Sequence, residues 1–416
     1  MGKTISEKIL SIKSASDAFA GDIIEASVDL AMSHDNTAMV SQIFRTLGFP
    51  NVWNKDKIII PIDHRAPANL IEVAEAHRQI RAFVKEQDIP HFYDIKAGIC
   101  HQILPEKGHV IPGELIVGSD SHTTTYGAFS AFSTGIGASE MAAVWATGTI
   151  WLKVPETVKI SINGSLGHRI SSKDIILSII GNLGADGASY KAVEYSGSGI
   201  GHLSMAARMT ICNMTMEMDA KAGIMPYDTR TESYLSSRVD QIPRPITPDK
   251  DASYLDDIHF DVNNLGPQVA CPHTVDNVKP VEEIAGIPIH QAVLGSCTNG
   301  RLEDLIAAAD ILRGRKVHQD VRLLIIPASQ EVYLQAIQTG VIQDLIKAEG
   351  VILNPGCGPC LGSHQGIIAK GETALTTTNR NFRGRMGHRD SNIYLASPET
   401  VAASAIHGEI SDPRTS

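Results

Sequence analysis

Short runs rich in isoleucine, leucine and valine recur along this chain, and several of them end at a cluster of polar or sulfur-bearing residues. The runs cover residues 57–62, 114–118, 322–327 and 351–354. Helical patterns follow two of them, at 67–85 and near 329–340. Alternation of buried strands with helices is typical of an α/β fold with parallel sheets. Because ligands of such sheets bind beyond the carboxyl ends of the strands, we expect the functional residues there.

The length of 416 residues exceeds one ordinary core and predicts two to three domains. We expect three α/β domains, at residues 1–153, 154–278 and 279–416. The first boundary is a predicted hinge that directly follows a helix rich in small residues, which we expect over 138–152. The second boundary is a crossing near 275–281, after which the chain carries a cysteine-rich segment.

The formal net charge is −10, with 43% hydrophobic and 20% charged residues. This balance is that of an ordinary globular protein. A nucleic-acid or anionic-membrane surface needs a basic face, so we expect neither partner. No apolar run approaches membrane-spanning length. We expect a cytoplasmic protein, in a reducing compartment where thiolates bind metals rather than form disulfides.

Three cysteines lie in two glycine-containing motifs. Cys297 belongs to Gly-Ser-Cys-Thr-Asn-Gly-Arg, and Cys357 and Cys360 belong to Pro-Gly-Cys-Gly-Pro-Cys. Three thiolates without an obvious fourth suit a cubane iron–sulfur cluster that has one iron not bound by protein. Fully ligated clusters carry electrons, whereas an open position lets a metal bind substrate as a Lewis acid. This pattern therefore indicates hydration or dehydration of an oxygen-rich anion.

Other interpretations of these cysteines stay open. A CxxC pair can be a redox pair of the thioredoxin type, the cysteines can belong to a structural zinc site, or they can be inert buried thiols. A structural zinc site would require a second closely spaced pair of ligands, which the sequence lacks. The remaining cysteines, Cys100, Cys212 and Cys271, are isolated in the sequence, and we expect each to be a small buried hydrophobic side chain.

Acidic residues stand beside histidines at two predicted strand ends, in Asp63-His64 and in Asp120-Ser121-His122. A carboxylate can fix the protonation state of a neighbouring group, and histidine titrates near neutral pH. Both segments are therefore candidates for proton transfer. The alternative for each is a structural contact that has no catalytic role.

Two further residues are candidates for proton transfer. His101 follows an apparent strand end, and Glu194 stands where an apolar segment meets glycines. Carboxylates are uncommon in such a segment. A histidine packed in the core and an exposed surface glutamate are the alternatives.

Residues 376–385 place three arginines around an aromatic residue and a glycine. Guanidinium groups bind carboxylates in a bidentate manner, so this segment suits a di- or tricarboxylate ligand. A solvated basic loop is the alternative, which Phe382 and the overall acidity of the chain disfavour.

Taken together, these motifs resemble those of the aconitase superfamily, and the resemblance covers essentially the whole chain. The motifs that carry it are Gly-Ser-Asp-Ser-His-Thr, Gly-Ser-Cys-Thr-Asn-Gly-Arg, Pro-Gly-Cys-Gly-Pro-Cys and Asn-Arg-Asn-Phe-Arg-Gly-Arg. They are most similar to the large subunits of the split isopropylmalate dehydratase/homoaconitase branch. The resemblance implies an α/β fold with three α/β/α domains around a central cleft that holds an iron–sulfur cluster.

The resemblance also implies roles for individual residues. The implied ligands of a 4Fe–4S cluster are Cys297, Cys357 and Cys360. The implied catalytic residues are Asp63, His64, His101, Asp120, His122 and Glu194. The implied substrate-binding residues are His34, Ser121, Asn379, Arg380 and Arg385. His34 stands where aconitase itself has glutamine, as in the isopropylmalate branch, and Tyr126 stands where that branch more often has histidine.

Single-chain aconitases carry a further, swivelling domain whose Gly-Ser-Ser-Arg motif supplies the serine that acts as catalytic base. The segment Tyr-Leu-Ser-Ser-Arg at 234–238 lacks the glycine and precedes a proline-rich loop, so we do not expect it to take this role. We expect the serine on a separate small subunit, which also contributes to substrate selection.

The implied activity is that of a hydro-lyase that isomerises 2-isopropylmalate to 3-isopropylmalate by dehydration and rehydration, in leucine biosynthesis. Homoaconitate, in lysine or coenzyme B synthesis, and 2-methylmalate are alternative substrates. The expected partners are the small subunit and a di- or tricarboxylate substrate. A non-catalytic alternative is an iron-sensing RNA-binding protein, which the net charge of −10 disfavours.

Overall fold

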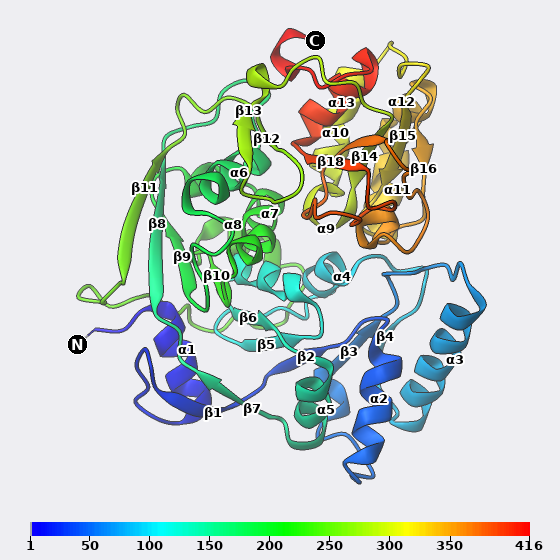
Figure 1. Cartoon of the computed structure of the whole chain (residues 1–416). Coiled ribbons are helices and arrows are strands. Elements are labelled where there is room, and N and C mark those ends of the chain that lie inside the picture. Colours follow the sequence, from blue (N-terminus) through cyan, green and yellow to red (C-terminus); the bar gives the residue numbers. More distant parts are fainter. Residues whose placement is uncertain (1) are drawn as a thin grey trace.

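The computed structural model describes residues 2–416 and contains three α/β units, each built on its own sheet (Figure 1). The first unit lies at the bottom of Figure 1, the second at the left and the third at the upper right. The strands within each main sheet are mostly parallel. The predicted α/β fold class is therefore confirmed.

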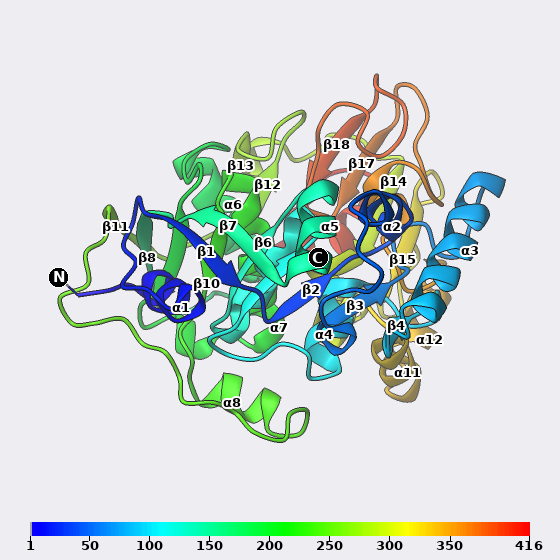
Figure 2. The same ribbon diagram turned by 90° about the horizontal axis from the view of Figure 1, so that it is seen from below.

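The first unit contains a sheet of five parallel strands in the order β4-β3-β2-β5-β6. These strands are β2 (Leu30–Met32), β3 (Ile58–Pro61), β4 (His91–Tyr93), β5 (Leu115–Gly118) and β6 (Phe132–Gly135). Its helices are α1 (Ile5–Ser14), α2 (Thr37–Thr46), α3 (Ile71–Glu86), α4 (Cys100–Glu106) and α5 (Ala138–Thr147). An antiparallel ribbon of β1 (Ile23–Ser27) and β7 (Thr149–Lys153) lies beside α1 (Figure 2).

The two faces of the first sheet bury side chains into different cores. Ile58 and Ile60 of β3 pack with aromatic residues of α2, α3 and α5, where the rings of Phe83 and Trp145 stack 5.1 Å apart. Ile59, between them, points to the opposite face, as the two-residue period of a strand requires. There it joins a core that the other two units share.

The second unit contains a sheet of four parallel strands in the order β10-β9-β8-β11. These strands are β8 (Thr157–Asn163), β9 (Ala192–Ser196), β10 (Ala222–Ile224) and β11 (Asp256–Asp261). Its helices are α6 (Ser172–Leu183), α7 (Met205–Met214) and α8 (Thr229–Leu235). The shared core includes Ile160 of β8 and Val293 of the third unit, so the three units pack as one body.

The third unit contains a sheet of seven strands in the order β13-β12-β18-β17-β14-β15-β16. These strands are β12 (Gln268–Ala270), β13 (Val278–Pro280), β14 (Gln291–Gly295), β15 (Arg322–Ile326), β16 (Val351–Ile352), β17 (Thr373–Thr376) and β18 (Asn392–Leu395). Its helices are α9 (Ser296–Asn299), α10 (Leu302–Leu312), α11 (Gln330–Gln338), α12 (Val341–Lys347) and α13 (Pro398–His407). Because β12 pairs with β18, this sheet begins before residue 279, the boundary that the sequence suggests.

The local elements differ from the sequence-based expectations in three places. The helix expected over 138–152 ends at Thr147, because Gly148 takes a left-handed conformation (φ 74°) and the next residues pair as β7. α3 begins at Ile71 rather than at 67. His101 lies in the first turn of α4 rather than directly after a strand. Within residues 2–416, no helix is both long and apolar enough to span a membrane.

Candidate active site

A cavity of about 270 Å³ lies between the first and third units. It contains all the residues that the sequence suggested for cluster and substrate binding, together with four of the suggested catalytic residues. These residues are His34, His64, His101, Asp120, Ser121, His122, Cys297, Cys357, Cys360, Asn379, Arg380 and Arg385. Ser119, Ser296 and Leu361 also line it. Asp63 lies just behind the wall, and Glu194 lies elsewhere.

The cavity forms where the carboxyl ends of two parallel sheets face each other. His34, His64 and Asp120 follow β2, β3 and β5 of the first sheet. Cys297 and Asn379 follow β14 and β17 of the third sheet. Strand ends present side chains and unpaired backbone groups at one edge, which is where α/β proteins bind ligands. The two sheets thus provide opposite walls of a single site.

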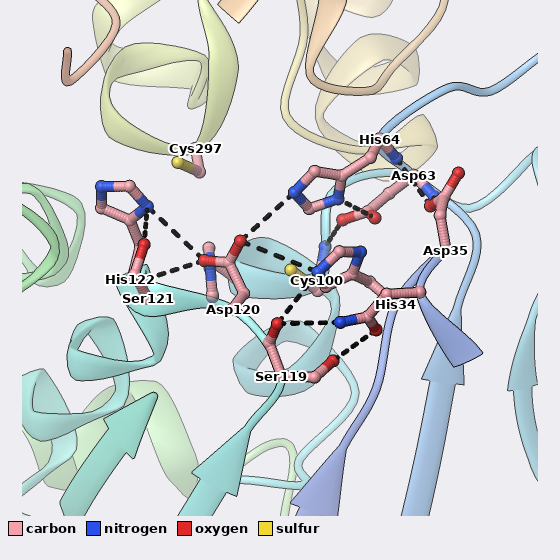
Figure 3. Close-up of polar contacts among 12 residues, drawn as sticks. His34, Asp35, Asp63, His64, Cys100, Ser119, Asp120, Ser121, His122 and Cys297 are labelled. Carbon is pink, nitrogen blue, oxygen red and sulfur yellow. Dashed lines mark hydrogen bonds and ion pairs between the residues drawn. The ribbon is translucent and has the colours of Figure 1, made fainter. Parts of the chain in front are cut away.

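The carboxylate of Asp120 is the centre of a histidine network (Figure 3). Its Oδ1 lies 2.8 Å from His101 Nε2 and accepts a hydrogen bond of 2.8 Å from the backbone N–H of His122. Its Oδ2 lies 3.2 Å from His64 Nε2. Burial opposes the charged form of this carboxylate, but hydrogen bonds from the three histidines outweigh it and hold the pKa of Asp120 well below its usual range. Asp120 is therefore an anion that can hold a proton on a neighbouring ring.

A second acid orients His64 from the other side of its ring. His64 Nδ1 lies 2.7 Å from Asp63 Oδ1, and Asp63 Oδ2 accepts a hydrogen bond of 2.7 Å from the backbone N–H of Cys100. Burial would lower the pKa of His64, but the nearby acidic groups, Cys357 first among them, raise it well above the ordinary value. The ring is thus fixed in position between two carboxylates, a geometry that favours the imidazolium form.

His34 differs from His64 although the two rings stack 3.9 Å apart (Figure 3). Its Nε2 lies 3.2 Å from the backbone oxygen of Ser119, while its buried Nδ1 has no hydrogen-bond partner in the described part of the chain. Burial lowers the pKa of His34, and the neighbouring His64 lowers it further. His34 is therefore a neutral ring with one ring nitrogen available to a ligand.

Glu217 is a site residue that the sequence analysis did not select. Its Oε1 lies 2.7 Å from His122 Nε2 and accepts a hydrogen bond of 2.9 Å from Arg380 Nε. The side chain is buried in the second unit, so this unit also contributes to the site. Glu217 stands in the methionine-rich segment 214–218, an acid in apolar surroundings. This is the same signal that selected Glu194.

Glu194 does not join this group. It lies in β9 with 3% exposure, and its Oε1 accepts a hydrogen bond of 3.0 Å from the backbone N–H of Ser6 in the first turn of α1. Its Oε2 accepts one of 3.1 Å from the hydroxyl of Tyr254. Burial raises the pKa of Glu194 to about 7. The carboxyl binds a helix N-terminus, and it lies apart from the catalytic cavity because β9 directs it toward α1.

The three motif cysteines are buried, and all six cysteines of the chain are free. The sulfur of Cys297 accepts hydrogen bonds from the side-chain amides of Asn213 (3.3 Å) and Asn379 (3.5 Å). The thiol of Cys360 lies 3.5 Å from Asn379 Oδ1. Burial raises the pKa of Cys297 to about 12, so metal binding there releases a proton. Asn213, like Glu217, is a second-unit residue that the sequence analysis did not select.

The spacing of the cysteine sulfur atoms distinguishes a site for a single metal ion from a site for a larger cluster. Ligands of a single zinc ion lie about 2.3 Å from it, and their sulfur atoms therefore lie within about 4 Å of one another. Within residues 2–416, the only groups of potential ligands that converge within 4.8 Å come from His34, Asp35, Asp63 and His64, without any cysteine. Three buried thiols around one cavity, spread more widely than one ion requires, fit a larger group such as a cubane cluster.

Comparisons with known proteins agree with this geometry. The model of the aconitase family (aconitate hydratase) matches residues 7–286 and 277–408. The chain belongs to the aconitase family. It is 53% identical over 415 residues to 3-isopropylmalate dehydratase large subunit 1 of Methanopyrus kandleri, covering 100% of this chain and 99% of that protein.

Other members of the aconitase family are nearly as similar. A probable methanogen homoaconitase large subunit of Methanosarcina mazei is 52% identical over 390 residues, which are 94% of this chain and 99% of that protein. The 3-isopropylmalate dehydratase large subunit of Thermodesulfovibrio yellowstonii is 47% identical over 416 residues, with 99% of each chain covered. Relatives of two substrate specificities thus resemble this aconitase-family chain almost equally.

The two cavity arginines of this aconitase-family chain differ in their partners. Arg380 donates to both oxygens of Glu217 through Nε, at 2.9 and 3.2 Å. Among residues 2–416, the buried Arg385 Nε has no hydrogen-bond partner. Phe382, between them in the sequence, is 45% exposed and is not a lining residue of the cavity. Arg380 is therefore held in place by the protein, while Arg385 offers an unpaired donor to a ligand.

Proposed function

We propose that this chain is the large subunit of a 3-isopropylmalate dehydratase, a hydro-lyase that converts 2-isopropylmalate to 3-isopropylmalate by dehydration and rehydration. One observation carries the proposal: a single cavity has three free cysteines on one wall and the Asp120 network on the other. The identity to dehydratase large subunits over the whole chain supports the same activity.

Cys297, Cys357 and Cys360 are the residues that would hold a 4Fe–4S cluster. Such a cluster, when one iron is not bound by protein, supplies a Lewis acid for a substrate hydroxyl. Free thiols of this kind persist in a reducing compartment, so we place the protein in the cytoplasm.

The Asp120 network handles the proton of the leaving hydroxyl. A proton on His101 Nε2 or His64 Nε2 is held by the Asp120 carboxylate, and both rings line the cavity. Either ring can deliver its proton to a hydroxyl that leaves as water and recover it when water returns. General acid–base catalysis of this kind contributes about 10²- to 10⁴-fold to a rate.

Glu217 and Arg380 form a second group beside this network. Glu217 holds the imidazole of His122 and the guanidinium of Arg380 in fixed positions. The remaining donors of Arg380 and the Nε donor of Arg385 bind the substrate carboxylates, since guanidinium groups match carboxylate geometry. Ser121, Asn379 and His34 complete the contacts to an oxygen-rich substrate.

The serine that removes the proton from carbon in this family lies, on our proposal, on a separate small subunit. The relatives are named as large subunits, which supports a two-chain enzyme. The small subunit closes the cavity, supplies the base and contributes to the choice of substrate.

A homoaconitase large subunit is the second candidate. Its support is the identity of 52% to a relative that carries this name. Homocitrate, the hydroxy acid of that reaction, carries a third carboxylate on a two-carbon chain where 2-isopropylmalate has an isopropyl group, so the two substrates differ in the charge that the cavity must neutralise.

The test is anaerobic reconstitution of the chain with iron and sulfide, followed by addition of the small subunit. Formation of the alkene is followed by its ultraviolet absorbance with 2-isopropylmalate and with homocitrate as substrates. We expect turnover of 2-isopropylmalate only when both subunits are present. Turnover of homocitrate alone would favour the second candidate, and full activity without the small subunit would contradict the two-chain proposal.

A further inference from the structure

Arg301 lies directly behind the cysteine wall and has no role in the proposed reaction. It ends the motif that contains Cys297, and it is 3% exposed. Its Nη2 donates to the backbone oxygen of Cys297 at 2.8 Å, and its Nη1 donates to that of Thr298 at 2.8 Å. One planar group thus binds two consecutive carbonyls. A guanidinium fork of fixed geometry holds such a loop more rigidly than a flexible ammonium could.

The same guanidinium also reaches the first unit. Its Nε donates to Gln102 Oε1 at 3.1 Å, and Gln102 directly follows His101 in α4. Gln102 in turn donates to Glu106 at 3.2 Å, and Ser329 of the third unit donates to the same carboxylate oxygen at 2.6 Å. Arg301 therefore connects the loop that carries Cys297 to the helix that carries His101 on the opposite side of the cavity.

The guanidinium of Arg301 binds partners of a different kind from those of another buried arginine. Arg208 is fully buried and pairs with the carboxylate of Asp228. Within residues 2–416, every hydrogen-bond acceptor of the Arg301 guanidinium is a neutral oxygen, from an amide, a hydroxyl or a backbone carbonyl. The nearby Asp304 accepts instead from the backbone N–H of Arg301. A buried cation is costly unless a negative charge lies near it.

Asp304 is one acid near the Arg301 guanidinium, and the cavity wall would carry further negative charge when it holds a metal cluster. Cys297 lies four residues before Arg301 and binds metal only as a thiolate. A thiolate-bound cluster at this wall would add negative charge near the Arg301 guanidinium.

We propose that Arg301 is a positioning residue that fixes the Cys297 loop against the helix carrying His101 and supplies positive charge behind the cysteine sulfur. This inference rests on the proposed cluster at Cys297, Cys357 and Cys360. It predicts that Arg301 controls how firmly the cluster is held and its reduction potential, in addition to any effect on turnover.

Two substitutions separate the two parts of the proposal. Arg301→Lys keeps the charge and loses the fork, whereas Arg301→Gln loses the charge. The matched control is Arg238→Gln, because Arg238 lines the same neighbouring cavity as Arg301 but binds only the oxygens of Tyr234 and Ser237 in its own segment. Each reconstituted protein is compared with the wild type in iron release to a chelator, in cluster reduction potential, in kcat and KM with the small subunit, and in thermal unfolding of the cluster-free chain.

For Arg301→Lys we expect iron release about tenfold faster than wild type and a reduction potential close to wild type, since the charge remains. For Arg301→Gln we expect equally fast release and a reduction potential shifted to more negative values. In both variants kcat falls while KM changes by less than about twofold, because the substrate contacts remain. Arg238→Gln should match the wild type in all four measurements.

Iron release and reduction potential of Arg301→Gln equal to those of the control would overturn the proposal. If Arg301→Gln does not fold, a wild-type rate of iron release from Arg301→Lys overturns it just as well. If the variants are less stable to heat but release iron at the wild-type rate and keep the wild-type reduction potential, Arg301 has a structural role only. This outcome also contradicts the proposal. Failure of the proposed function is distinguishable, because the wild-type chain then either takes up no iron and sulfide or takes them up without turning over 2-isopropylmalate, before any variant is compared.

Discussion

Two glutamates of the second unit are almost equally buried but lie in very different surroundings. Glu194 is 3% exposed and Glu217 is 6% exposed. The donors to Glu194 are neutral: the N–H and hydroxyl of Ser6 and the hydroxyl of Tyr254. The partners of Glu217 are His122, which can carry a proton, and the cation Arg380. Burial alone therefore does not distinguish a catalytic carboxylate from a structural one.

The difference follows from what each carboxyl faces. Burial without a charged partner raises the pKa of Glu194 to about 7, so the group is protonated in much of the physiological range. Glu217 instead binds a guanidinium and an imidazole. A carboxyl with such partners can orient a histidine beside the cavity, whereas Glu194 caps a helix.

The largest expected effect is on turnover by Glu217→Gln. An amide cannot replace the carboxylate that binds both His122 and Arg380, so we expect kcat to fall by about 10²- to 10⁴-fold, the range of general acid–base catalysis. Steady-state kinetics of the reconstituted two-subunit enzyme measure it. The matched control is Glu194→Gln, which should stay within about threefold of wild type. If the two variants lose activity equally, the distinction between these glutamates is wrong.

The second-largest expected effect is the contribution of Glu194 to the pH dependence of the stability of the chain. Its pKa is raised from 4.5 to about 7, so between these values the folded chain holds a proton that the unfolded chain has lost. Because the folded chain binds more protons than the unfolded chain in this range, the free energy of unfolding falls as the pH rises from 4.5 to about 7. At about 1.4 kcal/mol for each pKa unit, the loss is at most about 3 kcal/mol. Half-buried carboxyls with raised pKa, such as Glu114 and Glu399, add effects of the same sign.

Glu194→Gln mimics the protonated carboxyl and removes this contribution. Relative to the wild type, the variant should unfold at a similar urea concentration at pH 5 and at a higher one at pH 8. Measurement on the cluster-free chain separates this from cluster binding. A variant that is less stable than wild type at pH 8 would show that Glu194 is needed as an anion.

A smaller effect is expected when Arg380 is changed to Lys. The ammonium cannot bind Glu217 and a substrate carboxylate with the geometry of a guanidinium. We expect kcat/KM to fall by about 10- to 100-fold, mainly through KM. The control is Arg383→Lys in the same segment, where the side chain is exposed and should tolerate the change. Equal kinetics of the two variants would remove Arg380 from the substrate site.

The smallest expected effect is at Tyr254, the hydroxyl partner of Glu194. Tyr254→Phe removes one hydrogen bond and should lower the free energy of unfolding by about 1 kcal/mol, with kcat unchanged. Urea unfolding and steady-state kinetics of the same preparation measure both. A loss of kcat here would connect the region around Glu194 to catalysis.

Local sequence patterns predict the parts of the site that are local in the chain. Asp63-His64 and Asp120-Ser121-His122 follow strands recognisable from their β-branched residues, and the structure gathers these segments into one network. Glu217 is different, because its partners are 95 and 163 residues away in the chain. No local pattern contains that pairing, and the local signal of an acid in an apolar segment selected Glu194 instead.

The fold shows the same limit of local patterns. The strands at β3, β5 and β15 lie where hydrophobic runs predict them. The helix expected over 138–152 is shorter, because Thr149–Lys153 finds β1 as a partner more than a hundred residues earlier in the chain. Pairing between distant segments thus decides what local propensity leaves undetermined.

The central claim is that the wall of Cys297, Cys357 and Cys360 holds an iron–sulfur cluster opposite the Asp120 network. The most direct measurement is the content of iron, acid-labile sulfide and zinc in the chain after anaerobic reconstitution, for the wild type, Cys357→Ala and Cys212→Ala. We expect about four iron and four sulfide per chain in the wild type and in Cys212→Ala, and a large loss of both in Cys357→Ala. One zinc without sulfide in the wild type would contradict the account.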